Sequence, residues 1–553
     1  MRLNLTVATL LTSGATLGVA AASKPKLSAN AQSLFDYAME VQDSRWDGSY
    51  NLIWYQDKGP WSIRFTAWYT AGLLHRNEGD DVEKAKAAIE NILASQMTSD
   101  YESAWYGTFK LSPDEPDPTP NSELYPPKIY DTYDPNWREF IGTQLIQDVE
   151  LYGDLLGDEL VNKIEDALEM QAVGAMRRNG SYPEGDNLIL GYSNPGLMRA
   201  LTVGWIGARR GNATFVDFAD AHGTQLLELF RSNGSDTLGE YNAPNYYGMD
   251  VWALAANIAY GPRGAAMTAN AGYILGRLWD DIAAHYNPYL GNLVGPYDRA
   301  YTRDMTKHSS ILPMYWWAVF GRESGPQPPK GEGDLLFDAA QGAAIALVSD
   351  TVAGHISEGA GAALRAKGAW EGSRSLERAV RAELDAAGSE VRNVTSWVSA
   401  PLMVGGQEVA EDVNRGNQFV PAIVHWASDP GHAPFPYVGF FLLYPSASTV
   451  KAVAGERSLS VSYPNATQAG SDVFTFALSG IPPSWTLGGR TISGLEELPC
   501  LSVNVSAPGL ERLPVSYGEQ LRNHWYYNVS YAVPAGFEGV PRVDLTMEYT
   551  CEV

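Results

Sequence analysis

The chain has little cysteine and little positive charge, and each of these shortages excludes some classes of protein. Two cysteines in 553 residues exclude a dense disulfide scaffold, and no C-x-x-C pair is present for metal binding or redox exchange. The eight histidines show no H-x-x-x-H or H-x-H spacing, and no G-x-G-x-x-G or P-loop sequence occurs. Lys and Arg number 39 against 64 Asp and Glu, and no basic stripe offsets the formal net charge of -25. We therefore expect no cofactor, no metal site and no nucleic-acid partner.

Long apolar runs are also missing. A spanning helix needs about 20 strongly apolar residues, so we expect no membrane span. Residues 1–22 have a positive Arg2, an apolar and small-residue stretch, and an alanine-rich end, which is typical of a secretory signal peptide. The protein is thus predicted to be secreted and extracellular, where Cys500 and Cys551 would form a disulfide. Asn-x-Ser/Thr triplets predict glycosylation at Asn179, Asn212, Asn233, Asn393, Asn465, Asn504 and Asn528.

The first part of the chain, residues 23–320, has apolar residues at three- and four-residue spacing, which predicts helices. Asp134-Pro135 and Asn194-Pro195 each place a capping residue before a proline, as at a helix start. The predicted helices span 29–42, 61–76, 81–97, 135–156, 158–177, 195–210, 214–231, 246–260, 265–285 and 308–320. Their alternating short and long loops favour an (α/α) toroid of helical hairpins as the catalytic domain, with an open helical solenoid as the alternative.

A Pro- and Gly-rich stretch, residues 321–333, is predicted to be a linker. The remainder, 334–553, is predicted to form an antiparallel β-sandwich domain, with one charged amphipathic helix at 375–387. Its predicted strands span 419–426, 437–444, 459–463, 473–478, 501–505, 525–533 and 543–549. Helices followed by strands exclude a parallel α/β enzyme.

Three segments concentrate polar and aromatic residues: 130–143, 239–250 and 295–308. With 16 Trp and 30 Tyr in the chain, they suit a cleft for sugars, which present apolar C–H faces and hydroxyl edges. The candidate substrate-binding residues are Tyr130, Trp137, Asn242, Tyr297, Tyr301 and Arg303. Structural roles stay open for the same segments: Asn136 as a helix cap, Tyr246 and Tyr247 as packing residues, and Asp298 with Arg299 as an ion pair.

Asn136-Trp137, followed by Phe140-Ile-Gly-Thr143, resembles the Asn-Trp…Ile-Gly element of toroid-plus-β-sandwich polysaccharide lyases of the chondroitin and hyaluronate lyase type. The resemblance implies that Asn136 neutralises a uronate carboxylate, that Tyr246 or Tyr247 is base and acid, and that Arg299 supports the leaving side. Such chemistry needs donors for the developing enolate and a base whose pKa a neighbouring cation lowers. The family has a histidine shortly before its tyrosine, whereas this chain has Glu240-Tyr-Asn242.

Other functions remain open on the sequence. A glycoside hydrolase in the same cleft needs two carboxylic acids, about 6.5–9.5 Å apart for inversion. Glu240 is then the candidate acid and Asp298 the candidate base, and Asp134, Asp250 and Asp304 are further acids of these segments. The missing histidine favours this hydrolase, and the Asn-Trp element favours the lyase. A non-catalytic carbohydrate-binding protein and a small-metabolite isomerase or dehydratase are the remaining alternatives. The expected partner is a polysaccharide or oligosaccharide.

Overall fold

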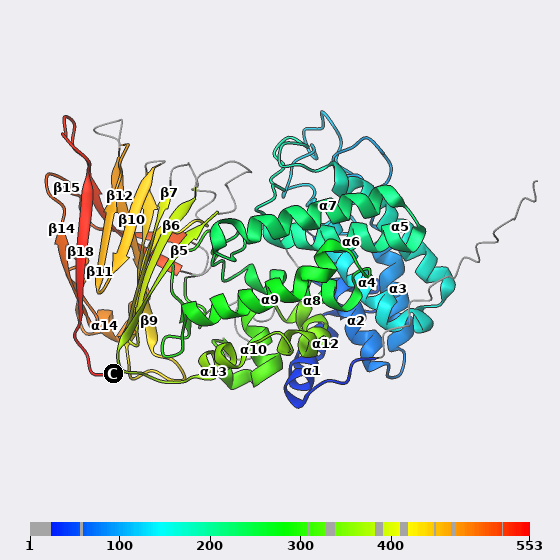
Figure 1. Ribbon diagram of the computed structural model, residues 1–553, viewed down its shortest axis with the longest axis horizontal. Coiled ribbons are helices and arrows are strands. Elements are labelled where there is room, and N and C mark those ends of the chain that lie inside the picture. The colour runs from blue at the N-terminus through cyan, green and yellow to red at the C-terminus, as the bar shows by residue number, and fades with distance from the viewer. Residues whose placement is uncertain are drawn as a thin grey trace, which may run out of the picture.

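The computed structural model describes residues 24–55, 59–301, 303–307, 310–327, 338–381, 391–409, 418–446, 449–465, 472–521 and 524–553. The predicted signal peptide, part of the predicted linker and the side chain of Asn233 lie outside the described part of the chain. The helices come first in the chain and a large curled sheet follows. The helical part and the sheet lie next to each other, one at each end of the long axis of the molecule (Figure 1).

All ten predicted helices are present, with bounds close to those expected. Ser28, Ser62 and Asn212 cap three of them by accepting hydrogen bonds from backbone N–H groups of the first turn. The helices are α1 Ala29–Asp43, α2 Ile63–Arg76, α3 Asp81–Ala94, α4 Trp137–Leu156, α5 Asp158–Arg177, α6 Ser193–Arg210, α7 Ala213–Phe230, α8 Tyr247–Tyr260, α9 Ala266–His285 and α10 Leu312–Phe320, followed by α12 Gly342–Ala353 and α13 Glu358–Arg365.

The helices close into a ring. Helices α2, α4, α6, α8 and α12 pack on one another in that order, and α12 returns to α2. Helices α3, α5, α7 and α9 lie outside this ring, each against one or two of its members. The inner helices are buried on most sides; α8, for example, buries Val251, Trp252 and Leu254 completely. The (α/α) toroid is therefore confirmed, and the open solenoid is not what forms.

The boundary between helices and strands falls later than predicted. Helices α12 and α13 follow the Pro- and Gly-rich stretch, so the helical part of the molecule continues beyond it. Helix α12 completes the inner ring and buries Ala344 and Ile345 fully. Its sequence combines four alanines with four β-branched residues, so its composition alone does not distinguish a helix from a strand. The helical part consequently extends to Arg365.

The second half is one curled antiparallel sheet. In the described residues the strand order is β13-β14-β18-β11-β10-β7-β8-β9-β12-β17-β15, with β16 on β17 and β5-β6 on β7. The main strands are β5 Ser373–Val380, β6 Arg392–Ser399, β7 Leu402–Val409, β8 Ala422–Asp429, β9 Tyr437–Pro445, β10 Val450–Gly455, β11 Ser458–Ser462, β12 Val473–Ser479, β14 Leu501–Ser506, β16 Ser516–Leu521, β17 His524–Ala532 and β18 Arg542–Tyr549. The short ones are β13 Glu497–Leu498 and β15 Glu511–Arg512. Curling brings Trp426, Phe441 and Leu545 into one core, as in a sandwich.

The predicted helix at 375–387 is wrong in its described part. Residues Ser373–Val380 form strand β5, which pairs with β6 along its whole length. Exposed and half-buried side chains alternate along most of β5, and cross-strand pairing outweighs the local helical pattern there.

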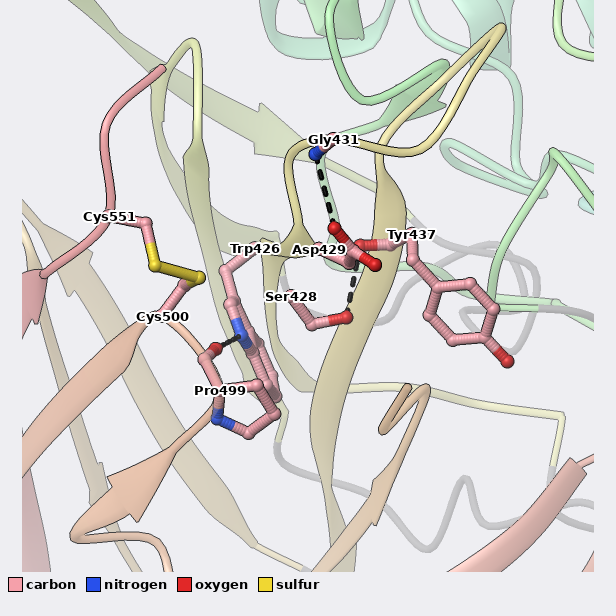
Figure 2. The surroundings of a disulfide bond; sticks show 8 residues. All are labelled: Trp426, Ser428, Asp429, Gly431, Tyr437, Pro499, Cys500 and Cys551. Carbon is pink, nitrogen blue, oxygen red and sulfur yellow. Dashed lines mark hydrogen bonds between the residues drawn. A yellow bond between two sulfur atoms is a disulfide. The ribbon is translucent and has the colours of Figure 1, made fainter. Parts of the chain in front are cut away.

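The predicted disulfide is confirmed between Cys500 and Cys551, 51 positions apart. Beside it, the Trp426 indole donates a hydrogen bond of 2.7 Å to the Pro499 carbonyl (Figure 2). Among the predicted glycosylation sites, Asn179, Asn393, Asn465 and Asn504 are exposed, and Asn212 and Asn528 are half-buried. No helix in the described residues combines the length and apolarity that crossing a membrane requires.

Candidate functional site

Three consecutive inner helices start beside one another. The residues just before α4, α6 and α8 are Asn136, Tyr192 and Tyr246, and none of these side chains caps its own helix. The Asn136 amide nitrogen lies 3.2 Å from the Tyr192 hydroxyl. The Arg299 guanidinium lies 4.9 Å from the Tyr192 ring centroid and 4.0 Å from that of Tyr246. One end of the ring thus gathers an amide, two phenols and a guanidinium.

Asn136 is held so that its amide donors face the phenols. Arg178 donates a hydrogen bond of 2.7 Å to the Asn136 side-chain oxygen. The Asn136 NH2 group can then donate to the hydroxyls of Tyr130 and Tyr192, each 3.2 Å away. Arg178 is itself fixed by an ion pair of 2.7 Å with Asp186. The buried Asn136 side chain therefore does not act as the helix cap that the sequence left open.

Arg299 connects the phenols to both halves of the molecule. It donates hydrogen bonds of 2.8 Å to the Tyr246 hydroxyl and of 2.8 Å to a Glu240 carboxylate oxygen. Its Nε donates at 3.0 Å to Gln418, which lies in the segment that leads into β8. The Tyr246 hydroxyl also shares a hydrogen bond with Tyr301. The sheet thus takes part in positioning this cluster.

The cluster is rich in hydrogen-bond donors. Burial raises the pKa of Tyr246 well above its usual value, and the positive charge of Arg299 opposes part of that rise. Burial raises the pKa of Tyr192 in the same way. Both phenols are accordingly protonated near neutral pH. The starts of α4, α6 and α8 add the positive ends of three helix dipoles. Such a place favours a carboxylate or another oxygen-rich anionic group.

A cavity of about 130 Å³ adjoins the cluster. Tyr130 connects the cavity to the cluster. Its side chain lines the cavity, and its hydroxyl accepts a hydrogen bond from the Asn136 amide and donates one of 2.7 Å to the Asn187 side-chain oxygen. The backbone of Tyr130 has φ of 65°, a left-handed conformation that costs a bulky residue about 1–3 kcal/mol. The other lining residues are Tyr55, Trp61, Ser62, Arg64, Leu111, Asp134 and Trp137. Aromatic walls beside a donor cluster suit a saccharide.

Several predicted site residues belong to the core instead. Tyr247 is 1% exposed, and its hydroxyl accepts a 2.6 Å hydrogen bond from the Asn242 backbone N–H. The Asn242 side chain donates to the carbonyls of Val294 and Pro296. The Tyr297 hydroxyl donates to the Leu293 carbonyl.

Arg303 is likewise buried and donates to the carbonyl of Tyr301. Tyr247, Asn242, Tyr297 and Arg303 are buried, and the hydrogen bonds of their polar groups go to the backbone of the surrounding loops. Each polar group is instead used to fix the loops beneath the cluster.

The two acids expected for hydrolysis are also engaged elsewhere. Glu240 is fully buried at the start of α6, where one oxygen accepts hydrogen bonds from the Ser193 backbone N–H and the Asn194 amide, and the other pairs with Arg299. Asp298 accepts from the Gln407 amide at 3.0 Å and is 6% exposed.

Asp250 and Asp304 are buried as well. Of the five acids considered, only Asp134 lines the cavity, and burial raises its pKa. The pair of facing carboxylic acids expected from the sequence is therefore not formed by Glu240 and Asp298.

Sequence reasoning missed Tyr192, Arg178 and Gln418. Tyr192 had a usable signal: it stands just before a helix that opens with Asn194-Pro195, as Asn136 and Tyr246 stand before theirs. Arg178 follows the end of α5, and Gln418 belongs to the other half of the molecule. Neither has a local pattern that points to the cluster, because only the tertiary fold brings them there.

The chain is similar in its course to several solved structures. They include heparinase III, with a TM-score of 0.42 and 10% identity over 95% of this chain and 85% of that one. Endoglucanase CelQ from Clostridium thermocellum, complexed with cellobiose and cellotriose, has a TM-score of 0.31 and 9% identity over 94% and 93%. Heparan sulfate lyase HepC from Pedobacter heparinus has a TM-score of 0.28 and 8% identity over 96% and 84%. These values concern the course of the chain and assign no activity.

No curated protein matches the sequence. Two family models do, one over each half of the molecule. The model for the sheet, Domain of unknown function (DUF8770), matches residues 375–548. The model for the helical ring, Domain of unknown function (DUF8769), matches residues 32–350, which is more than half of the chain. The chain belongs to the DUF8769 family.

Proposed function

We propose that this protein is a secreted lyase that cleaves a uronic-acid-containing polysaccharide by β-elimination. One observation carries the proposal: the starts of α4, α6 and α8 meet, and they present Asn136, Tyr192 and Tyr246 around Arg299. Elimination next to a carboxylate needs donors for that carboxylate, a group that takes the neighbouring proton, and a donor for the leaving oxygen. The cluster contains side chains suited to each task.

In the proposed mechanism the uronate carboxylate lies against the Asn136 amide and the helix starts. Hydrogen bonds there stabilise the negative charge that grows on the carboxylate as the α-proton leaves. The Asn136 NH2 group faces the hydroxyls of Tyr130 and Tyr192 in this structure, so the carboxylate would take the place of one of these hydroxyls as its acceptor. The hydrogen bond from Arg178 keeps the amide NH2 group turned toward that position.

Tyr246 is the proposed base and acid. Its phenolate takes the α-proton, the bond from the β-carbon to the glycosidic oxygen breaks, and a carbon–carbon double bond forms. The same hydroxyl then returns the proton to the leaving oxygen. Arg299 donates to the Tyr246 oxygen at 2.8 Å, and its charge favours the phenolate. The adjoining aromatic cavity would hold a neighbouring sugar ring.

Hydrolysis is less well supported than elimination. Both carboxylate oxygens of Glu240 accept hydrogen bonds, one from the start of α6 and one from Arg299. Glu240 is therefore not placed to donate a proton to a glycosidic bond. Asp298 is bound by Gln407 and buried. Asp134 lines the cavity, but a single acid does not supply both of the roles that glycoside hydrolysis needs.

Secretion and glycosylation form part of the same proposal. The signal-peptide pattern of residues 1–22 supports export, and the Cys500–Cys551 disulfide suits an oxidising compartment. The exposed positions of Asn179, Asn393, Asn465 and Asn504 leave room for glycans.

The test is to incubate the purified protein with a panel of unsulfated polyuronides, sulfated uronic-acid polysaccharides and neutral glycans. The ultraviolet absorbance of an unsaturated uronide and the release of reducing ends are followed together. We expect both signals to rise in parallel on at least one uronic-acid polymer. Reducing ends without absorbance would mean hydrolysis and contradict the proposal. Neither signal on any polymer would contradict enzymatic depolymerisation and favour a binding protein.

A further inference from the structure

A second and larger cavity lies between the helical ring and the sheet. Its volume is about 820 Å³, within the range of about 300–1,000 Å³ typical of small-molecule sites. The chain after α9, α10 and α13 forms one side, and the loop between β8 and β9 forms the other. The lining shares no residue with the Asn136–Tyr246 cluster or the cavity beside it.

The walls of this second cavity are aromatic and proline-rich. Tyr286, Tyr289, Phe435 and Tyr437 line it, together with four prolines. Rings of this kind present flat apolar faces, against which the C–H face of a sugar packs well. The exposed His432, Ala433 and Pro434 stand at the solvent side, so the cavity is accessible.

The charge of the lining has the opposite sign to that of the protein. Lys307, Lys367 and Arg322 line the cavity. Glu323, the one acid of the lining, pairs with Arg322 at 3.4 Å, and the buried Asp304 lies 3.8 Å from Lys307. The lining still has a net positive charge in a chain with a formal net charge of -25. The Lys307 ammonium lies 3.5 Å from the centroid of the Tyr437 ring, and Lys367 is exposed. A local basic concentration on an acidic molecule attracts anions to that place.

The loop that forms the sheet side is well braced. Asp429 accepts a hydrogen bond of 3.1 Å from the Gly431 backbone N–H, and Ser428 donates one of 3.0 Å to the Tyr437 carbonyl. Figure 2 shows the Tyr437 side chain directed away from the Cys500–Cys551 disulfide. A preformed wall lets a ligand bind without the entropic cost of ordering the loop.

We propose that this second cavity binds an acidic oligosaccharide, one that carries carboxylate or sulfate groups. The lysines contact the anionic groups and the aromatic rings cover the sugar faces. The inference stands on the residues of this cavity alone. It adds a binding site apart from the proposed lyase cluster.

The experiment measures binding by calorimetry with three probes: a uronic-acid hexasaccharide, a sulfated hexasaccharide and a neutral hexasaccharide. Protein carrying Lys307→Ala and Lys367→Ala is compared with the unaltered protein and with Lys84→Ala. Lys84, on α3, is the control, since it pairs with Asp80 and lines neither cavity. Thermal melts verify that all three proteins are folded.

We expect the double variant to bind the acidic probes about tenfold or more weakly, and Lys84→Ala to bind them as the unaltered protein does. Preference for the uronate or for the sulfated probe identifies which anion the site takes, and either supports the proposal. Equal binding of the neutral probe, or no loss in the double variant, would overturn it.

The absorbance assay keeps this result separate from the lyase proposal. If the unaltered protein shows no elimination but its binding of the acidic probes depends on the two lysines, the lyase proposal is refuted and the proposed binding site is supported. Normal elimination together with lysine-independent binding would refute only this site.

Discussion

Two single variants at adjacent positions, Tyr246→Phe and Tyr247→Phe, should have different effects. The first should lower activity, and the second should lower stability. Both changes remove one phenolic oxygen and keep the ring. The Tyr246 hydroxyl interacts with Arg299 and Tyr301 at the cluster, whereas the Tyr247 hydroxyl accepts the backbone N–H of Asn242 in the core. Each variant is therefore the matched control of the other.

The expected magnitudes follow from these contacts. General acid–base catalysis typically contributes about 10²–10⁴-fold, so Tyr246→Phe should lower kcat by that factor. Its stability should change by about 1 kcal/mol, because Tyr246 is only half-buried and Arg299 keeps its hydrogen bonds to Gln418 and Glu240. Tyr247→Phe leaves the buried Asn242 N–H without its acceptor, which should cost about 1–3 kcal/mol of unfolding free energy.

The assay follows unsaturated uronide absorbance on the best substrate, and urea unfolding gives the stability of each variant. Tyr247→Phe should retain most of its activity at temperatures below its lowered melting point. The reasoning would be refuted if Tyr246→Phe stayed active, or if Tyr247→Phe lost activity while keeping its full stability. In either case Tyr246 would not be the residue that moves the proton.

Three further outcomes are expected. Burial raises the pKa of Tyr246, so its phenolate is the minor form at neutral pH, and kcat/KM should rise about tenfold per pH unit in that range; an acidic optimum would point to carboxylic acids instead. Asn136→Ala should lower kcat by about 10²–10³-fold and also cost about 1–3 kcal/mol of unfolding free energy, because the buried Arg178 loses an acceptor; unchanged kinetics would remove the amide from the mechanism. Replacing Cys500 and Cys551 with serine should destabilise the sheet by about 4 kcal/mol, given their separation of 51 positions, and an unchanged urea midpoint would contradict that.

The helices could be predicted from the sequence because their signals are local. Spacing of apolar residues and starts such as Asp134-Pro135 place α4 and α6 within two residues of their observed bounds. Strand β5 could not be predicted in the same way, since its pairing with β6 is decided across the sheet. Helix α12 was missed because an alanine-rich stretch after a Pro- and Gly-rich segment carries no sign of the ring that it completes.

The segments that form the candidate site could be predicted from the sequence, but the role of each residue in them could not. Asn136, Tyr246 and Arg299 lie together as the three polar segments suggested. The choice between Tyr246 and Tyr247 depends on which side of the α8 start faces the cluster, and one residue along a helix turns a side chain by about 100°. The role of Glu240 depends on where α6 begins relative to the neighbouring loop, which no local pattern contains.

The closed ring has a consequence for how the protein is made. Helices α1 and α2 emerge first from the ribosome, yet α12 packs on both of them. The Asn30 side chain donates to the carbonyl of Val319, 289 positions later. At about 5–20 residues per second, tens of seconds of translation pass before that partner exists. During this interval the sides of α1 and α2 that α12 later covers stay exposed, although α3 and α4 already pack on α2, so nascent chains should depend on chaperones until α12 has been synthesised.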